Sequence, residues 1–178
     1  MSDKILQVKN LCVSFSSYAG KVQAVRDVSF DLYRGETLSI VGESGSGKSV
    51  TTKAVLGILS GNATIESGEI LYNGADLAKF QDKDFADIRG KKISLVFQDP
   101  LSALNPIMKI GKQIVEALVL SGSTPKGEAK EKALDLMRRV GIPQPEIRFN
   151  QYPFQFSGGM RQRIVIAIAL ASDPEILI

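Results

Sequence analysis

The feature that most constrains the fold is an apolar pentapeptide followed at once by a glycine-rich loop, TLSIV-GESGSGKS. The spaced glycines let such a loop curl until consecutive backbone N–H groups point inward and form a nest for an anion. The residues that follow, 48–59, favour a helix that stops near Gly61, and a helix adds the positive end of its dipole to the nest. A buried strand over 37–41, an anion nest and a helix predict a phosphate-binding α/β unit.

The loop also satisfies the pattern G-x-x-x-x-G-K-[ST], and each residue type in it has a chemical reason. The Lys48 ammonium can reach the β- and γ-phosphates of a nucleotide, and the Ser49 hydroxyl can bind Mg²⁺. The residues predicted to hold the nucleotide are Gly42, Glu43, Ser44, Gly45, Ser46, Gly47, Lys48, Ser49 and Val50. Kinases, GTPases, helicases and transporters all use such loops, so this motif alone does not choose among them.

A second candidate site lies in the stretch QFSGGMRQR. Ser157 is a good N-cap for a helix that continues through the apolar run 164–171. Arg161 and Arg163 add positive charge to a helix end that is already positive, which is unfavourable unless an anion arrives. Gly158 and Gly159 beside the cap leave the backbone N–H groups open, so we predict a second phosphate site, with an ordinary capped helix as the alternative.

The remaining segments read as strands near the N-terminus and helices in the middle of the chain. A strand with one wet face is predicted over 22–32, where Val22, Ala24, Val28, Phe30 and Leu32 alternate with polar residues. Further strands are predicted over 93–97 and 175–178. Between them, one helix contains Ile110, Ile114 and Leu118 and ends at Gly122, and another runs from a Thr124 N-cap to Gly141.

Composition excludes several kinds of site. The net charge of +3 is too small to argue for nucleic acid. Cys12 is the only cysteine and there is no histidine, so an internal disulfide and a structural zinc site are not expected. No apolar run has the length of a signal peptide or a membrane span. We therefore expect an intracellular chain that reaches a membrane only through a partner.

The two phosphate motifs together resemble those of the ATP-binding-cassette (ABC) ATPases. The resemblance implies an α/β P-loop fold. Residues 1–98 would form the N-terminal antiparallel β-subdomain and the P-loop core, and residues 99–155 a helical insertion. Residues 156–178 would form the signature helix and the start of a last strand. It implies that Ser157, Gly158, Gly159 and Met160 contact the ATP held by a second subunit. Gln98 is similar to the glutamine that touches Mg²⁺ and the attacking water, and Phe15 to the aromatic that stacks on adenine, with Tyr18 as an alternative.

Two longer stretches, VFQDPLSALNPIMKIGKQIVEAL and YPFQFSGGMRQR, resemble the ATPase subunits of peptide and nickel importers. Such a subunit uses ATP and Mg²⁺ and pairs with a second ABC ATPase, identical or paralogous. Its further partners are transmembrane permease subunits and, indirectly, an extracytoplasmic solute-binding protein. The resemblance thus implies a peripheral protein on the cytoplasmic face of the inner membrane, with no nucleic-acid partner. The transported solute is chosen mainly by the other subunits, so the sequence does not name it.

The last residues, ILI, correspond in this family to the strand that leads into the Walker B aspartate and the catalytic glutamate. Neither acid occurs within residues 1–178, where Asp173 and Glu175 precede the strand. We therefore expect this polypeptide alone to bind ATP but to hydrolyse it poorly, and no catalytic acid is assigned. The alternative function is a non-catalytic nucleotide-binding fragment with no transport role. ABC ATPases of DNA repair are disfavoured because the sequence has no zinc ligands between the two motifs. P-loop kinases are disfavoured because no segment resembles the lid that covers a phosphate-acceptor substrate.

Overall fold

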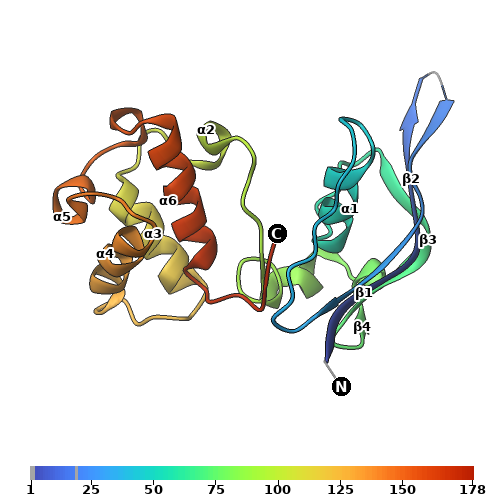
Figure 1. The fold of residues 1–178 in the computed structure, drawn as a ribbon, viewed down its shortest axis with the longest axis horizontal. Helices are drawn as coiled ribbons and strands as arrows, with labels where there is room; N and C mark the ends of the chain where they lie inside the picture. The colour runs from blue at the N-terminus through green and yellow to red at the C-terminus, as the bar shows by residue number, and fades with distance from the viewer. Residues whose placement is uncertain (1–2, 19) are drawn as a thin grey trace. The chain divides into compact units, whose positions relative to one another are not determined.

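The computed structural model describes residues 3–18 and 20–178, which form two compact units, Met1–Ala86 and Asp87–Ile178 (Figure 1). Within the described residues, no helix has the length and apolar character needed to cross a bilayer.

The first unit is a four-stranded antiparallel sheet with one α-helix against it (Figure 1). The strand order is β2-β1-β3-β4, and β1 at the centre pairs with β2 on one side and β3 on the other. The helix contacts β2 and the short 3₁₀ turn after the sheet. The elements are β1 (Lys4–Ser17), β2 (Gly20–Tyr33), α1 (Lys48–Val55), β3 (Ala63–Tyr72), β4 (Ala75–Asp76), η1 (Leu77–Lys79) and η2 (Asp82–Asp87).

A bulge crosses this sheet and changes which face of β2 is buried. Asn10 and Asp27 both have positive φ, and the Asn10 side-chain amide donates to Asp27 Oδ1 at 2.7 Å. The register between β1 and β2 shifts on both sides of this point. An extra residue in a strand reverses the inward and outward alternation beyond it. The strand over 22–32 is confirmed, but Val25 is the buried residue at its start and Val22 is 60% exposed, so the predicted face is wrong there.

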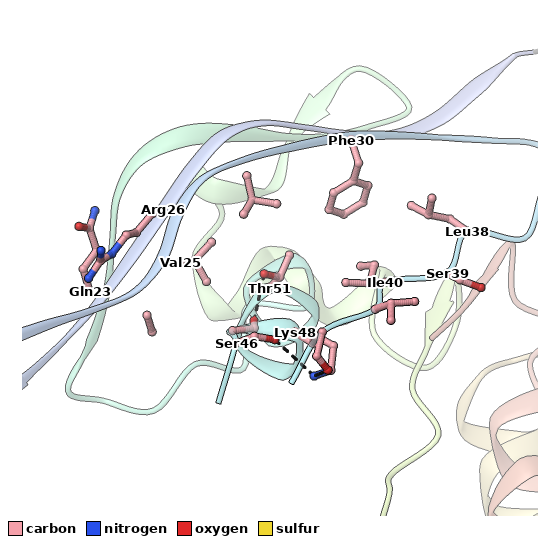
Figure 2. A pocket seen from close by; sticks show the side chains of 15 residues that line it. Gln23, Val25, Arg26, Phe30, Leu38, Ser39, Ile40, Ser46, Lys48 and Thr51 are labelled. Carbon is pink, nitrogen blue, oxygen red and sulfur yellow. Dashed lines mark hydrogen bonds between the residues drawn. The ribbon is translucent and has the colours of Figure 1, made fainter. Parts of the chain in front are cut away.

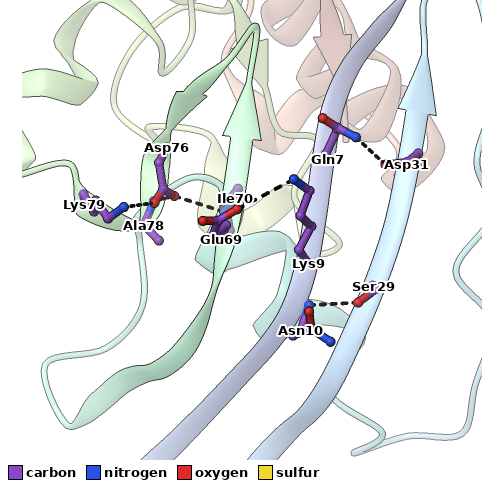
Figure 3. A network of polar contacts seen from close by, with 10 residues as sticks. All are labelled: Gln7, Lys9, Asn10, Ser29, Asp31, Glu69, Ile70, Asp76, Ala78 and Lys79. Atoms are coloured by element: carbon purple, nitrogen blue, oxygen red, sulfur yellow. Dashed lines mark hydrogen bonds and ion pairs between the residues drawn. The ribbon is translucent and has the colours of Figure 1, made fainter.

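Polar contacts join neighbouring strands of the same sheet (Figure 3). The Asp76 carboxylate accepts hydrogen bonds from the backbone N–H groups of Ile70 and Ala78 and pairs with Lys79 at 3.0 Å. Burial alone would raise the pKa of Asp76, but the Lys79 ammonium and the two N–H groups outweigh it and leave the pKa below its usual range. Asp76 thus fixes the turn that joins β4 to η1.

The second unit is a helical bundle joined to a two-stranded parallel sheet (Figure 1). Ile93 and Ser94 pair with Ile176 and Leu177, and the Val96 amide donates to Ile178 O at 2.8 Å. Strands at both predicted positions are therefore confirmed, and they are neighbours. The elements are β5 (Ile93–Ser94), α2 (Pro100–Ala103), α3 (Ile110–Leu120), α4 (Ala129–Arg139), α5 (Pro145–Arg148), η3 (Pro153–Gln155), α6 (Gly158–Leu170) and β6 (Ile176–Leu177).

The core of the second unit is formed by the apolar faces of α3, α4 and α6. Ile110, Ile114 and Leu118 are fully buried, as their helical spacing predicts, and Met137 and Ile164 pack in the same cluster. The chain turns at Gly122 and Gly141, which both have positive φ, so these two helix ends are confirmed. The Thr124 cap is wrong: α4 begins at Ala129, because Gly127 lies in a turn that precedes it.

The predicted strand over 37–41 does not form. None of its residues belongs to either sheet of the described chain, and Leu38, Ile40 and Val41 are exposed. An apolar run only favours a strand, and it becomes one when a neighbouring strand supplies hydrogen bonds. The segment that leads into the glycine-rich loop therefore has no regular secondary structure.

We expect Asp76→Asn to lower the free energy of unfolding by about 1 kcal/mol at pH 7, because the ion pair with Lys79 is lost. The effect depends on pH. The Asp76 carboxylate stabilises the fold above the pKa of the unfolded chain, near 4, and this stabilisation is lost as the pH falls through the lower folded pKa. Urea unfolding at pH 7 and pH 3 measures it, with Asp135→Asn, on an exposed helix face, as the control. An equal effect at both pH values would contradict this account.

We expect Gly111→Ala to destabilise the protein by about 1 to 2 kcal/mol. A Cβ at Gly111 would lie 2.3 Å from the ring of Phe149, so the ring has to move out of the core. Gly127→Ala is the matched control, since a Cβ there meets nothing within 4 Å. Thermal and urea unfolding of both variants measure the difference, and equal stabilities would show that the ring adjusts freely.

Candidate functional site

The glycine-rich loop, residues 42–48, lies so close to β2 at Gly47 that there is no room for a side chain there. Gly47 is the N-cap of α1 with φ of 91°, and a Cβ there would lie 2.6 Å from the carbonyl oxygen of Ala24. A Cβ at Gly42 would lie 2.6 Å from Ser46 Oγ. At Gly47 the positive φ and the close Ala24 carbonyl are therefore a backbone geometry that only glycine permits, whereas Gly42 is crowded by a side chain of the loop itself.

The Lys48 side chain folds back across this loop. Its ammonium donates to the carbonyl oxygens of Gly42 and Glu43, each at 2.7 Å. It also lies 3.4 Å from Ser46 Oγ (Figure 2). These three acceptors are uncharged. The ammonium therefore lies beside the open backbone of the loop, and the three acceptors do not neutralise its positive charge. Such a charge can bind an anion.

A cleft of about 570 Å³ opens between β2, the segment 38–42 and the start of α1 (Figure 2). Lys48 and Ser46 lie at one end, while Phe30, Leu38 and Ile40 give it an apolar wall. Its volume lies in the range of small-ligand sites. The lining residues are Gln23, Ala24, Val25, Arg26, Val28, Phe30, Leu38, Ser39, Ile40, Val41, Gly42, Ser46, Gly47, Lys48 and Thr51.

The structure brings together part of the predicted loop set and adds residues that the sequence analysis missed. Gly42, Ser46, Gly47 and Lys48 line the cleft. Glu43, Ser44, Gly45 and Ser49 are exposed, and Val50 is half-buried. Thr51 was missed: it is buried, and its hydroxyl donates to Gly47 O at 3.1 Å.

The β2 side chains in the cleft, among them Gln23 and Arg26, were also missed. The only indication of them in the sequence is that they belong to β2, the strand that the glycine-rich loop approaches. No motif marks them.

The two aromatic residues considered for adenine lie outside this cleft. Phe15 is half-buried in β1, opposite Val22 on one neighbouring strand and Ala63 on the other. Tyr18, beyond the end of β1, is fully exposed. Neither lines the cleft, so stacking of either ring on a base stays a prediction.

The second motif forms the start of α6. Ser157 is the N-cap, as predicted, and its hydroxyl oxygen accepts a hydrogen bond from Met160 N at 3.3 Å. A Cβ at Gly158 or Gly159 would meet nothing within 4 Å. Neither residue is needed for packing within its own unit, and the two leave the backbone of the first turn accessible.

The two arginines of this motif have neutral partners in the chain. Arg161 Nε donates to the carbonyl oxygens of Pro153 and Phe156 at 3.0 and 2.9 Å. Arg163 donates to the carbonyl oxygen of Gly141 at 2.8 Å. These carbonyls offset the charge of the two arginines in part, and an anion at this helix end stays a prediction.

Gln98 lies in the exposed segment that follows β5, next to Asp99, which caps α2. It belongs to the second unit with the Ser157 motif, whereas the glycine-rich loop and Phe15 belong to the first. Over residues 3–18 and 20–178, no group of three or more histidine, cysteine or acidic side chains could hold a metal ion. Binding of Mg²⁺ by Ser49 and Gln98 stays a prediction.

Comparison with known proteins gives clear matches. A family model described as ABC transporter matches residues 25–178. The dipeptide transport ATP-binding protein DppD of Lactococcus lactis subsp. cremoris is 56% identical over 99% of this chain and 51% of its own length. The oligopeptide transport ATP-binding protein OppD of Bacillus subtilis is 52% identical over 98% of this chain and 49% of its own length. The chain thus spans about half the length of the curated relatives it matches.

Solved structures with the same fold include the ATP-binding cassette MJ0796 in a dimeric, post-hydrolysis state bound to ADP and Pi. Its TM-score is 0.84 at 27% identity, over 97% of this chain and 72% of that one. The cassette cbiO1 of Clostridium perfringens, part of an ABC transporter complex, has a TM-score of 0.75 at 26% identity, over 98% of this chain and 64% of that one. The α/β P-loop fold with an antiparallel β-subdomain is confirmed.

We expect Lys48→Ala to weaken binding of a nucleoside triphosphate by about 10- to 100-fold, because a charge-assisted contact to phosphate is lost. Lys53→Ala is the matched control, since Lys53 is an exposed lysine in the last turn of the same helix. Fluorescence titration with a labelled ATP analogue measures both. Equal affinities of the two variants for the analogue would show that Lys48 does not contribute to nucleotide binding.

Proposed function

The chain belongs to the ABC transporter family, and we propose that it is the ATP-binding part of a subunit that energises peptide import. The observation that carries this proposal is the geometry at the glycine-rich loop. An ammonium, an open N-terminal helix end and a cleft of about 570 Å³ lie together there. A triphosphate offers the charge and the size that this arrangement accepts.

In the proposed complex, ATP lies with its phosphates on residues 42–49, and the Ser49 hydroxyl would bind Mg²⁺. Gln98, in the second unit, is a proposed Mg²⁺ ligand on the resemblance alone. When bound, Mg²⁺ would neutralise part of the phosphate charge. The chain's own residues orient the nucleotide: Lys48 gives up its contacts to the Gly42 and Glu43 carbonyls and takes phosphate oxygens instead. Adenine stacking by Phe15 belongs to this proposal.

The start of α6 is proposed to act on a second nucleotide. Its N-terminal turn is accessible at Gly158 and Gly159, and Ser157 provides a hydroxyl there. In a pair of ABC subunits these groups would face the γ-phosphate of the ATP on the other subunit. A dimeric arrangement of the related cassette MJ0796 supports this proposal.

The peptide substrate and the partners are inferred from relatives. Proteins more than half identical to this chain carry the names dipeptide and oligopeptide transport ATP-binding protein. We propose transmembrane permease subunits as partners, a solute-binding protein acting through them, and a peripheral place on the cytoplasmic face of the membrane.

Peptide uptake by the cells that make this protein tests the proposal. We expect Lys48→Ala in the chromosomal copy to reduce uptake of a labelled di- or oligopeptide to background, while Lys53→Ala retains it. The amount of protein in the membrane fraction is the control for assembly. Normal uptake with Lys48→Ala would reject the transport role. ATP binding that is lost without any change in uptake would favour a nucleotide-binding fragment that does not act in transport.

A further inference from the structure

The turn before α6 is held at several points, and a side chain of α6 itself makes one of these attachments. Upstream, Gln151 O and Phe149 O accept hydrogen bonds from Ile110 N and Gly111 N at the start of α3, each at 2.9 Å. Downstream, Phe156 is 2% exposed in the helical core. The stretch between these points, residues 152–155, has only local hydrogen bonds of its own.

Arg161 makes the remaining attachment. It lies in the first turn of α6, and its Nε reaches back to the carbonyl oxygens of Pro153 and Phe156 at 3.0 and 2.9 Å. One planar group thus connects the 3₁₀ turn η3, the residue before the cap and the helix. Its geometry fixes the direction in which the chain enters α6.

The Arg161 contacts also keep a positive charge at the N-terminal end of α6. A cation in the first turn opposes the helix dipole, and two carbonyl dipoles offset this only in part. The same turn has no acidic residue, and its exposed backbone lies at Gly158 and Gly159. Arg163 differs, because it reaches Gly141 at the end of α4 and not the turn before the cap.

We propose that Arg161 is a positioning residue. It holds residues 153–156 so that the Ser157 hydroxyl and the Gly158 and Gly159 N–H groups are set in advance for a phosphate carried by another subunit. This inference rests on the proposed function, in which that phosphate is the γ-phosphate of ATP. Arg161 itself does not touch the nucleotide, and its effect passes through the backbone of the turn.

The test compares Arg161→Gln, Arg161→Lys and Arg139→Gln in the protein as its cells make it. Arg139→Gln removes the same charge from an exposed position in the last turn of α4. Three properties are measured: the thermal midpoint, the affinity of the monomer for a labelled ATP analogue, and dimerisation in a non-hydrolysable ATP analogue by sedimentation. Monomer binding depends on the glycine-rich loop, whereas dimerisation also needs the start of α6.

We expect Arg161→Gln to raise the protein concentration at half-dimerisation about 10-fold, the effect of one charge-assisted contact. Monomer affinity should change less than twofold, and Arg139→Gln should behave as wild type. Arg161→Lys should recover part of the dimerisation, since an ammonium can still reach one carbonyl.

Unchanged dimerisation of Arg161→Gln would overturn the proposal. If Arg161→Gln lowered both the thermal midpoint and the affinity of the monomer for the ATP analogue, the proposal would also be overturned, because Arg161 would then only stabilise the fold. Failure of the proposed function would appear in the wild type, as a lack of ATP binding or of ATP-dependent dimerisation. That result would remove both proposals together and is distinct from a defect confined to Arg161.

Discussion

The contact between the backbone of Gly47 and that of Ala24 is the constraint on which the first unit depends. A Cβ on residue 47 would lie 2.6 Å from the Ala24 carbonyl oxygen, so the chain passes close to β2 with a positive φ and then begins α1 at once. This start places Lys48 within reach of the Gly42 and Glu43 carbonyls. It also leaves the cleft between β2 and residues 38–42 open. The loop, the helix and the cation are consequences of one close approach.

Local chemistry explains what could be predicted from the sequence. The glycine-lysine motif of the phosphate loop, the Ser157 cap and the helical spacing of Ile110, Ile114 and Leu118 can each be read from residues close together in the chain. Their geometry is set by backbone preference and helical period, which a single sequence contains. The fold class followed from these elements and from the resemblance to ABC ATPases, and the related structures confirm it.

The failures arise where distant residues decide the outcome. Residues 37–41 have the apolar pattern of a strand, but a strand also needs a hydrogen-bonded neighbour. The buried face of β2 changes at Asp27 because of a bulge that pairs it with Asn10, and nothing in the alternation of β2 reveals a partner on β1. The charge of Arg161 was visible in the sequence, but its carbonyl partners at Pro153 and Phe156 were not.

The N-terminal ends of the longer helices show that the two candidate sites are a specific feature of this chain. The start of α3 is covered by carbonyls of residues 149 and 151, and α4 has Glu131 in its first turn. Like α3, α1 and α6 have no acid and one basic side chain near their start, Lys48 or Arg161, but within the described residues no carbonyl of another segment covers their first turn. Charge of this sign at a positive helix end costs free energy in the isolated chain. A bound phosphate would reverse the sign of that contribution, so these two ends are the places where binding an anion has most to stabilise.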